Sequence, residues 1–315
     1  MKRLRFGILD LVPIIGGAGA AEAIGHTVRL AQAAERLGYT RYWVAEHHDM
    51  PAIASSSPEV LLAHIGAKTE TIRIGSGAVL LPYYKPYKVA ETFHMLATLY
   101  PGRIDLGIGR APGASAHASM ALSDNYLQQV HKLPESIQAL SELLADDFRV
   151  EQEHVSARPV PERPPELWLL GTGVKSANYA AVYGAGYVFG HFMSEEDGVR
   201  VAQTYADSFQ PSRLNSSPRI IVAVSVICAE TDEKAAEYAA QGAKAYLGAV
   251  AAEAGEQLAA RMARSVTGSP ERVREKLLEL IERYNADELL IITRTPDYES
   301  RMRSYELLAA ACIDF

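Results

Sequence analysis

The sequence predicts a closed (β/α)8 barrel, a TIM barrel in which helices surround eight parallel strands. Short runs rich in β-branched residues alternate with longer stretches of helical period, which is typical of a parallel sheet covered by helices. Eight such runs occur, and most are spaced as plain βαβ units. A doubly wound open sheet shares this alternation, but the chain shows no clear switch point and no Gly-x-Gly-x-x-Gly fingerprint after the first strand. These observations favour closure.

Each element is placed by its pattern of apolar residues. Helices are expected where apolar residues recur at intervals of three and four, so that each buries one stripe against the sheet. The expected strands lie near 4–11, 41–48, 72–81, 103–110, 166–171, 186–193, 218–229 and 288–293. The helical stripes are Ile24, Val28, Ala31 and Leu37; Val89, Phe93, Leu96 and Leu99; and Val273, Leu277, Leu280 and Tyr284, and a last helix near 298–311 completes the outer ring.

Two of the repeating units carry insertions, after the fourth and the seventh strand. These span about 111–165 and 247–266. The first is expected to hold one helix near 134–146 followed by an irregular, proline-rich loop. No linker rich in proline, glycine and serine divides the chain, so we expect residues 1–315 to form one domain.

Composition excludes several classes of protein. The net charge of −7 is spread along the chain without basic clusters, which argues against nucleic-acid binding. No apolar stretch approaches a membrane span, and the first residues lack the features of a signal peptide. The two cysteines, Cys228 and Cys312, form no CxxC pair and fit a reducing compartment. We therefore expect a cytoplasmic protein with a small-molecule partner, without nucleic-acid or membrane partners, assembled as a homodimer.

Strand 41–48 ends in four titratable residues, Glu46, His47, His48 and Asp49. Barrel enzymes keep their chemistry at the carboxyl ends of the strands. Neighbouring residues of a strand point to opposite faces, so His47 and His48 are poorly placed to bind one metal ion. The pattern favours a single functional histidine, with purely structural hydrogen bonding as the alternative.

The strand near 103–110 ends in Gly107, Gly109 and Arg110. The two glycines share a face and leave room for a ligand beside the backbone, while Arg110 offers planar donors to a phosphate. A tight strand exit with a surface arginine is the alternative interpretation.

The strand near 166–171 leads through Gly171, Thr172 and Gly173 into a helix with Ser176 in its first turn. A small-residue turn at a helix N-terminus presents free N–H groups that favour an anion. An ordinary helix cap is the alternative. Combined with Arg110 on the adjacent strand, the pattern favours a phosphate site.

The strand near 72–81 changes midway to small residues, which include Gly77 and Ala78. Such a stretch lets a flat ring lie against the backbone, and a bulge or bend explains it equally well. Tyr83 and Tyr84 follow, either as a pocket wall or as a cover for the barrel end.

Six ordered segments together resemble the bacterial-luciferase-like flavin oxidoreductases, in particular their alkanal-monooxygenase-like subgroup. The segments are AAERLGY (33–39), RYWVAEHH (41–48), RIGSG (73–77), PGRIDLGIGRAPG (101–113), LLGTG (169–173) and GSPE (268–271). The resemblance implies FMN at the barrel mouth, with its ring against Gly77 and Ala78, where the family often has a non-prolyl cis peptide.

The same resemblance assigns residues to roles. Arg110, Thr172, Gly173 and Ser176 match phosphate-binding positions, with Gly109 and Gly171 beside them. His47 matches the active-site histidine, which acts as a base or hydrogen-bond donor, and Glu46 accompanies it.

Two departures limit the transfer from the family. Gly109 stands where luciferase has a reactive cysteine, so light emission is not expected. Tyr83 and Tyr84 replace an Asn-His pair, which leaves the substrate open.

The leading hypothesis is an FMN-dependent oxidoreductase, a monooxygenase that uses reduced FMN and O₂ on a small organic substrate. Reduced FMN comes either from a separate flavin reductase or from NAD(P)H in place. The alternatives are a deazaflavin-dependent oxidoreductase of the same superfamily and a non-catalytic flavin-binding or storage protein. A third alternative is a metal-dependent barrel hydrolase, which needs metal ligands at several strand ends. Beyond the titratable residues at the end of strand 41–48, the only strong candidate ligand is His191.

Overall fold

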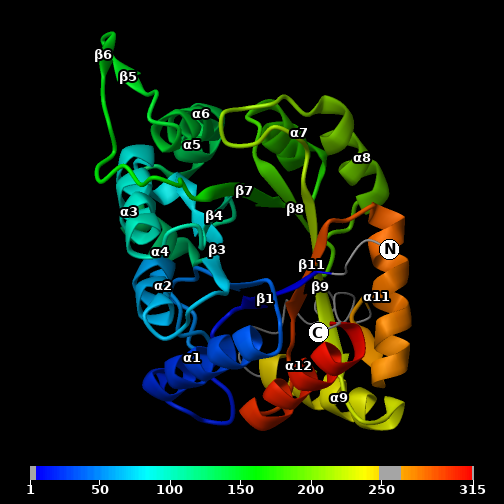
Figure 1. The fold of residues 1–315 in the computed structure, drawn as a ribbon. Coiled ribbons are helices and arrows are strands. Elements are labelled where there is room, and N and C mark those ends of the chain that lie inside the picture. The colour runs from blue at the N-terminus through cyan, green and yellow to red at the C-terminus, as the bar shows by residue number, and fades with distance from the viewer. Residues whose placement is uncertain (1–4, 248–263, 314–315) are drawn as a thin grey trace.

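The computed structural model describes residues 5–247 and 264–313, and it has the predicted TIM-barrel fold. Eight parallel strands form a closed ring, and helices surround it on the outside (Figure 1). Around the ring each strand pairs with the next, and the ring closes where β11 pairs with β1 and β9 pairs with both β8 and β11. The barrel strands are β1 (Phe6–Asp10), β2 (Arg41–Val44), β3 (Arg73–Leu80), β4 (Ile104–Gly109), β7 (Glu166–Gly171), β8 (Gly186–Gly190), β9 (Ile220–Cys228) and β11 (Glu288–Ile292).

All eight expected strands are present, and the outer helices follow them in alternation. The expected stripes lie on α1, α3 and α11, and the expected last helix is α12. One residue of those stripes differs: Leu99, in the last turn of α3, is 55% exposed because it lies beyond the part of the helix that faces the sheet. The outer helices are α1 (Ala20–Arg36), α2 (Pro58–Gly66), α3 (Pro86–Leu99), α6 (Leu133–Leu144), α7 (Val174–Val182), α8 (Gly198–Ser208), α9 (Asp232–Leu247), α11 (Pro270–Tyr284) and α12 (Tyr298–Cys312).

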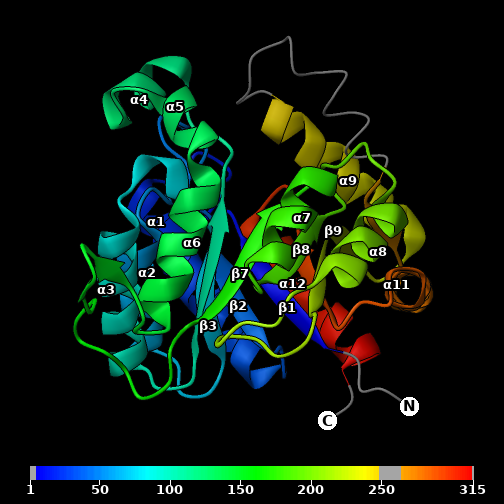
Figure 2. The same cartoon turned by 90° about the horizontal axis from the view of Figure 1, so that it is seen from above.

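The excursion after β4 is richer in structure than expected. Two short helices, α4 (Ala116–Leu122) and α5 (Tyr126–His131), precede the expected α6. Beyond α6 a small hairpin of β5 (Arg149–Val150) and β6 (Glu153–His154) projects from the barrel (Figure 1). In the view from above, α4 and α5 lie at one end of the molecule (Figure 2). The second insertion, 247–266, lies mostly outside the described residues.

A further short strand lies beside the ring. Residues 266–268 form β10 (Val266–Gly268), which pairs with β9 outside the ring. Gly268 then leads into α11, whose first residue is Pro270.

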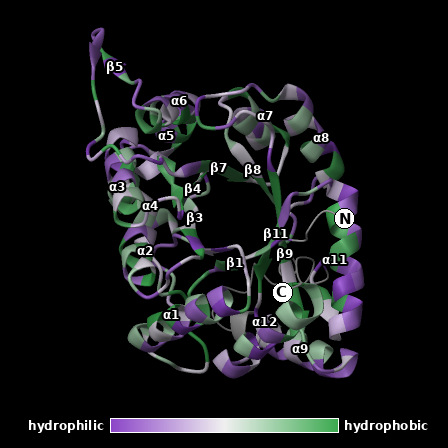
Figure 3. Cartoon of the chain, in the orientation of Figure 1, coloured by the Kyte–Doolittle hydropathy of each residue, from purple (hydrophilic) through white to green (hydrophobic). Residues whose placement is uncertain are grey.

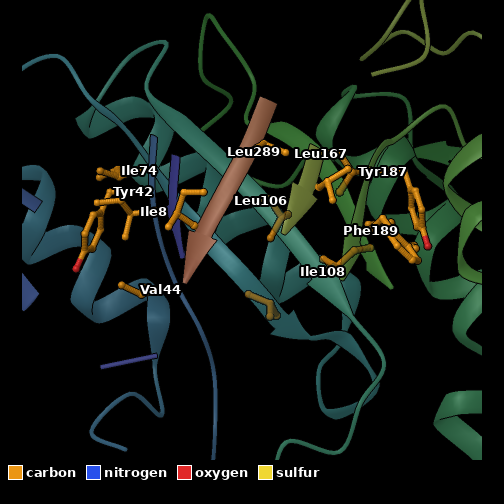
Figure 4. Packing of buried hydrophobic residues seen from close by; sticks show 14 of the residues in the cluster. Ile8, Tyr42, Val44, Ile74, Leu106, Ile108, Leu167, Tyr187, Phe189 and Leu289 are labelled. Atoms are coloured by element: carbon orange, nitrogen blue, oxygen red, sulfur yellow. The ribbon is translucent and has the colours of Figure 1, made fainter. Parts of the chain in front are cut away.

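The buried core has two layers, separated by the sheet. The larger lies between strands and helices and includes Ile8, Tyr42 and Leu106 (Figure 4). The smaller fills the barrel interior and centres on Trp43 and Trp168, whose ring centroids lie 6.0 Å apart. Because the strands have an apolar layer on each face, they are the most hydrophobic ribbons, whereas the helices are polar on their outer sides (Figure 3).

A cluster of ion pairs, three of its five side chains buried and two partly buried, closes the amino end of the barrel. We call it the ionic floor: Arg41, Arg73, Asp105, Glu166 and Glu288, each at or next to the first residue of its strand. The Asp105 carboxylate lies 2.7 Å from Arg41 Nη1 and accepts a hydrogen bond from the Trp43 indole at 2.8 Å. Arg41 Nε also contacts Glu288 at 2.9 Å, and these carboxylates raise the pKa of the guanidinium. The interior is therefore plugged at this end, and its accessible mouth lies at the carboxyl ends of the strands.

No helix among the described residues is long and apolar enough to cross a membrane.

Candidate functional site

The sequence-selected residues meet at the mouth because four neighbouring strands deliver them there. β2, β3, β4 and β7 are consecutive in the ring, with Val44 opposite Ser76, Leu80 opposite Gly109, and Ile108 opposite Leu169. Each candidate residue lies within the last part of one of these strands or just after it. They are Glu46 and His47, Gly77 and Ala78, Gly109 and Arg110, and Gly171, Thr172, Gly173 and Ser176.

The small residues of β3 form a break in its pairing with β4. The register shifts between Ser76 and Val79, and the Gly77-Ala78 peptide is cis, the feature that the family resemblance implied. A Cβ built on Gly77 would lie 2.5 Å from Leu9 Cδ1, so a side chain at this position would have to displace the Leu9 methyl group. The register shift is the bulge that the sequence offered as one explanation, and a flat ring lying against this stretch stays a prediction.

The two glycines of β4, Gly107 and Gly109, have different structural roles. A Cβ on Gly107 would lie 2.2 Å from the Ser76 backbone oxygen, so Gly107 permits close strand packing and does not leave space for a ligand, contrary to expectation. A Cβ on Gly109 would meet only the Ala78 Cβ, at 3.2 Å. Ala78 and Gly109 therefore form a low, side-chain-poor surface at the mouth.

Glu46 is a buried anchor for the segment after the cis peptide. Its carboxylate accepts hydrogen bonds from Leu80 N at 3.0 Å and from the Tyr84 hydroxyl at 2.7 Å, and it pairs with His48 Nε2 at 2.8 Å. The side chain is only 2% exposed, and burial raises its pKa despite these partners. This arrangement fixes the end of β3 against the end of β2.

His47 differs from its neighbours in having a buried nitrogen without a partner. Its Nδ1 makes no hydrogen bond, whereas its backbone N–H donates to Ser55 O at 2.9 Å. Burial, with the charges of His48 and Arg294, lowers the pKa of His47 from 6.5 to about 4. The imidazole is therefore neutral near pH 7, and its Nδ1 is a buried polar atom without a described partner.

The N-terminus of α7 is built around small residues. A Cβ on Gly171 would lie 2.0 Å from Ser176 Oγ, and one on Gly173 would lie 2.1 Å from Glu196 Oε1. The Ser176 hydroxyl donates to Gly173 O at 2.7 Å and closes the turn, while Thr172 is exposed. The Glu196 carboxylate accepts from Val174 N at 3.3 Å, so an anionic group already lies at this helix end.

Arg110 stands beside this turn, at the end of the neighbouring strand. Its side chain is exposed at the mouth, and its backbone carbonyl accepts a hydrogen bond from the Tyr126 hydroxyl of α5. Tyr83, for which two roles were open, has its ring centroid 5.1 Å from that of Tyr126, with the rings tilted by 33°, and its hydroxyl donates to Pro112 O at 2.8 Å. α5 is thereby attached to the rim next to Arg110.

Two residues of the mouth were missed from the sequence. Glu196 lies in the turn after β8, and Arg294 follows β11, with its guanidinium 5.7 Å from the Phe192 ring. A charged residue soon after a strand was the available signal in both cases.

His191, considered as a metal ligand, lies with Nδ1 3.0 Å from the Tyr284 hydroxyl. Over the ranges 5–247 and 264–313 no group of three or more His, Cys, Asp or Glu residues could hold a metal ion.

Comparison with known proteins identifies the family. Residues 4–287 match the family model of luciferase-like monooxygenases. YwcH of Bacillus subtilis, which has no assigned function, is 42% identical over 98% of both chains. The N-acetyl-S-alkylcysteine monooxygenase of Bacillus subtilis is 35% identical over 98% of both chains. The crystal structure of apo-MsnO8 superposes with a TM-score of 0.88 at 36% identity, covering 98% of each chain. The chain belongs to the luciferase-like monooxygenase family.

Proposed function

We propose that this protein is an FMN-dependent monooxygenase of the alkanal-monooxygenase-like subgroup, which oxidises a small organic substrate with reduced FMN and O₂. One observation carries the proposal: the Ala78–Gly109 surface lies at the same mouth as the α7 N-terminus and the buried, unpartnered nitrogen of His47. A flat ring, an anionic tail and a reacting group each find a matching environment there.

The residues at the mouth fit both ends of FMN, its flat ring and its phosphate. Ala78 and Gly109 would hold the flat ring, because neither position projects a side chain beyond a methyl group. Arg110 and the first N–H groups of α7 would hold the phosphate, since Glu196 shows that this helix end accepts an anion. When bound, reduced FMN supplies two electrons, so that one atom of O₂ enters the substrate and the other leaves as water.

His47 and Glu46 take different roles in this proposal. Neutral His47 donates or accepts a hydrogen bond at the reacting centre, and its lowered pKa keeps it uncharged throughout the physiological range. Glu46 is a positioning residue, because all of its described hydrogen bonds go to protein groups that fix the end of β3.

Titration with FMN, followed by an oxygen-uptake assay, tests the function. The purified protein is expected to bind FMN with a change in the visible spectrum, and to form a hydroxylated or otherwise oxygenated product when reduced FMN, O₂ and candidate substrates are supplied. A protein that binds neither FMN nor riboflavin would refute the proposal. Binding of FMN without product from a broad substrate panel would favour a flavin-storage role, and tight binding of a deazaflavin alone would favour that cofactor.

A further inference from the structure

A polar cavity of about 270 Å³ lies between the end of β8 and the helices α8 and α11. The charged residues that line it are Glu195, Glu196, Asp197, Arg264 and Arg283. Glu196 belongs both to this cavity and to the proposed phosphate position, because its carboxylate accepts a hydrogen bond from the first residue of α7. This carboxylate therefore lies between a helix N-terminus and a cavity that two arginines line.

The two arginines of the cavity have positive charges that their described contacts leave unneutralised. Arg264 Nη1 donates to the carbonyl of Ser194, two residues before Glu196, and Arg283 belongs to α11. In the part of the chain that the structure describes, neither forms an ion pair with a carboxylate. Both face His191, since burial and then the charges of Arg283 and Arg264 lower the pKa of that imidazole. The two guanidinium groups therefore act on the same part of the cavity.

Glu196 differs from the neighbouring Asp197 in how its carboxylate is held. Asp197 caps α8 and accepts from Val199 N at 3.0 Å, so its charge serves that helix. The Glu196 side chain is exposed, and its hydrogen bond from Val174 N is long, at 3.3 Å. Its backbone is fixed, because Glu196 N donates to Ser194 Oγ at 3.1 Å. The carboxylate can therefore leave α7 by a change of rotamer while the turn stays in place.

We infer that Arg264 and Arg283 are positioning residues for the flavin phosphate, because they receive the Glu196 carboxylate when a phosphate occupies the N-terminus of α7. An exposed ion pair then replaces the long hydrogen bond, and the negative charge of Glu196 is drawn away from the phosphate. Without the arginines the displaced carboxylate stays near the phosphate and repels it. The inference rests on the proposed function, which assigns a phosphate to this helix end.

The test compares the affinities of FMN and riboflavin, which share a ring and differ in the phosphate. Both are measured by quenching of flavin fluorescence at low ionic strength. The double substitution Arg264→Gln and Arg283→Gln should weaken FMN about three- to fivefold and leave riboflavin unchanged. Arg264→Lys with Arg283→Lys should keep the affinity for FMN, because both charges remain.

A double-mutant cycle separates this role from direct attraction of the phosphate. In a Glu196→Gln background the two arginine-to-glutamine changes should have no effect on FMN, since no displaced charge needs a partner. In a Glu195→Gln background, the matched control, the loss should persist. A loss that persists in the Glu196→Gln background, an equal loss for riboflavin, or no loss at all would overturn the inference while FMN still binds. If no variant binds FMN, the proposed function fails as well.

Discussion

Replacing Glu196 by glutamine is expected to tighten the binding of FMN and leave that of riboflavin unchanged. The carboxylate accepts from Val174 N at 3.3 Å, at the first residue of α7. One of its oxygens is so close to Gly173 that an added Cβ would lie 2.1 Å away. The proposed phosphate position therefore contains a negative charge, which must move away or repel the cofactor.

The size of the effect follows from the charge and its exposure. Two unit charges about 4 Å apart interact with about 1 kcal/mol in water and about 4 kcal/mol at an effective dielectric constant near 20. Glu196 is exposed, so the lower figure applies. A gain of about 1 kcal/mol corresponds to a dissociation constant for FMN roughly fivefold lower.

Quenching of flavin fluorescence at low ionic strength measures both affinities. Glu195→Gln is the matched control, because it removes the same charge at the neighbouring exposed residue and leaves the contact between Glu196 and Val174 N in place. A tighter complex with both flavins, or a weaker complex with FMN for Glu196→Gln, would contradict the reasoning.

Three further substitutions test other parts of the molecule. Arg110→Ala should weaken FMN roughly 10-fold or more and spare riboflavin in the same titration, and equal loss for both would exclude a phosphate contact. Because the pKa of His47 falls from 6.5 to about 4 on folding, the unfolded chain binds the extra proton between these values, so stability is full above pH 6.5 and is lost as pH falls towards 4. Between pH 7 and pH 5 this amounts to about 2 kcal/mol, and urea unfolding of His47→Gln should show a pH dependence smaller by that amount. Asp105→Ala leaves Arg41 and Arg73 without their shared carboxylate and should cost about 3–5 kcal/mol in urea unfolding, whereas a loss below about 1 kcal/mol would show that the cluster is dispensable.

The barrel could be predicted because each strand is a local signal. β9 and β11, for example, are apolar at nearly every position and buried along their whole length, as strands covered on both faces must be. The short helix α4 escaped prediction because it is mostly exposed and has no apolar stripe. β10 escaped it because three residues form a strand only through their partner β9.

For the candidate site, the sequence could predict which residues lie at the strand ends, but not the contacts that their side chains make. In a parallel barrel all carboxyl ends meet at one mouth, so residues such as His47 and Arg110 could be placed together from the sequence. Which atoms they meet depends on contacts between distant segments. Glu46 is held by Leu80, and the environment of His47 depends on Arg294, almost at the other end of the chain.

The ionic floor separates the residues that hold the barrel closed from those proposed to meet ligands. Its members occupy the starts of five strands, whereas the mouth residues occupy strand ends and the turns that follow. A substitution at the mouth leaves these buried ion pairs in place, so the loops can change without a matching loss of the fold. Residues at the mouth can therefore change, and substrate choice with them, while the residues that hold the barrel closed stay the same.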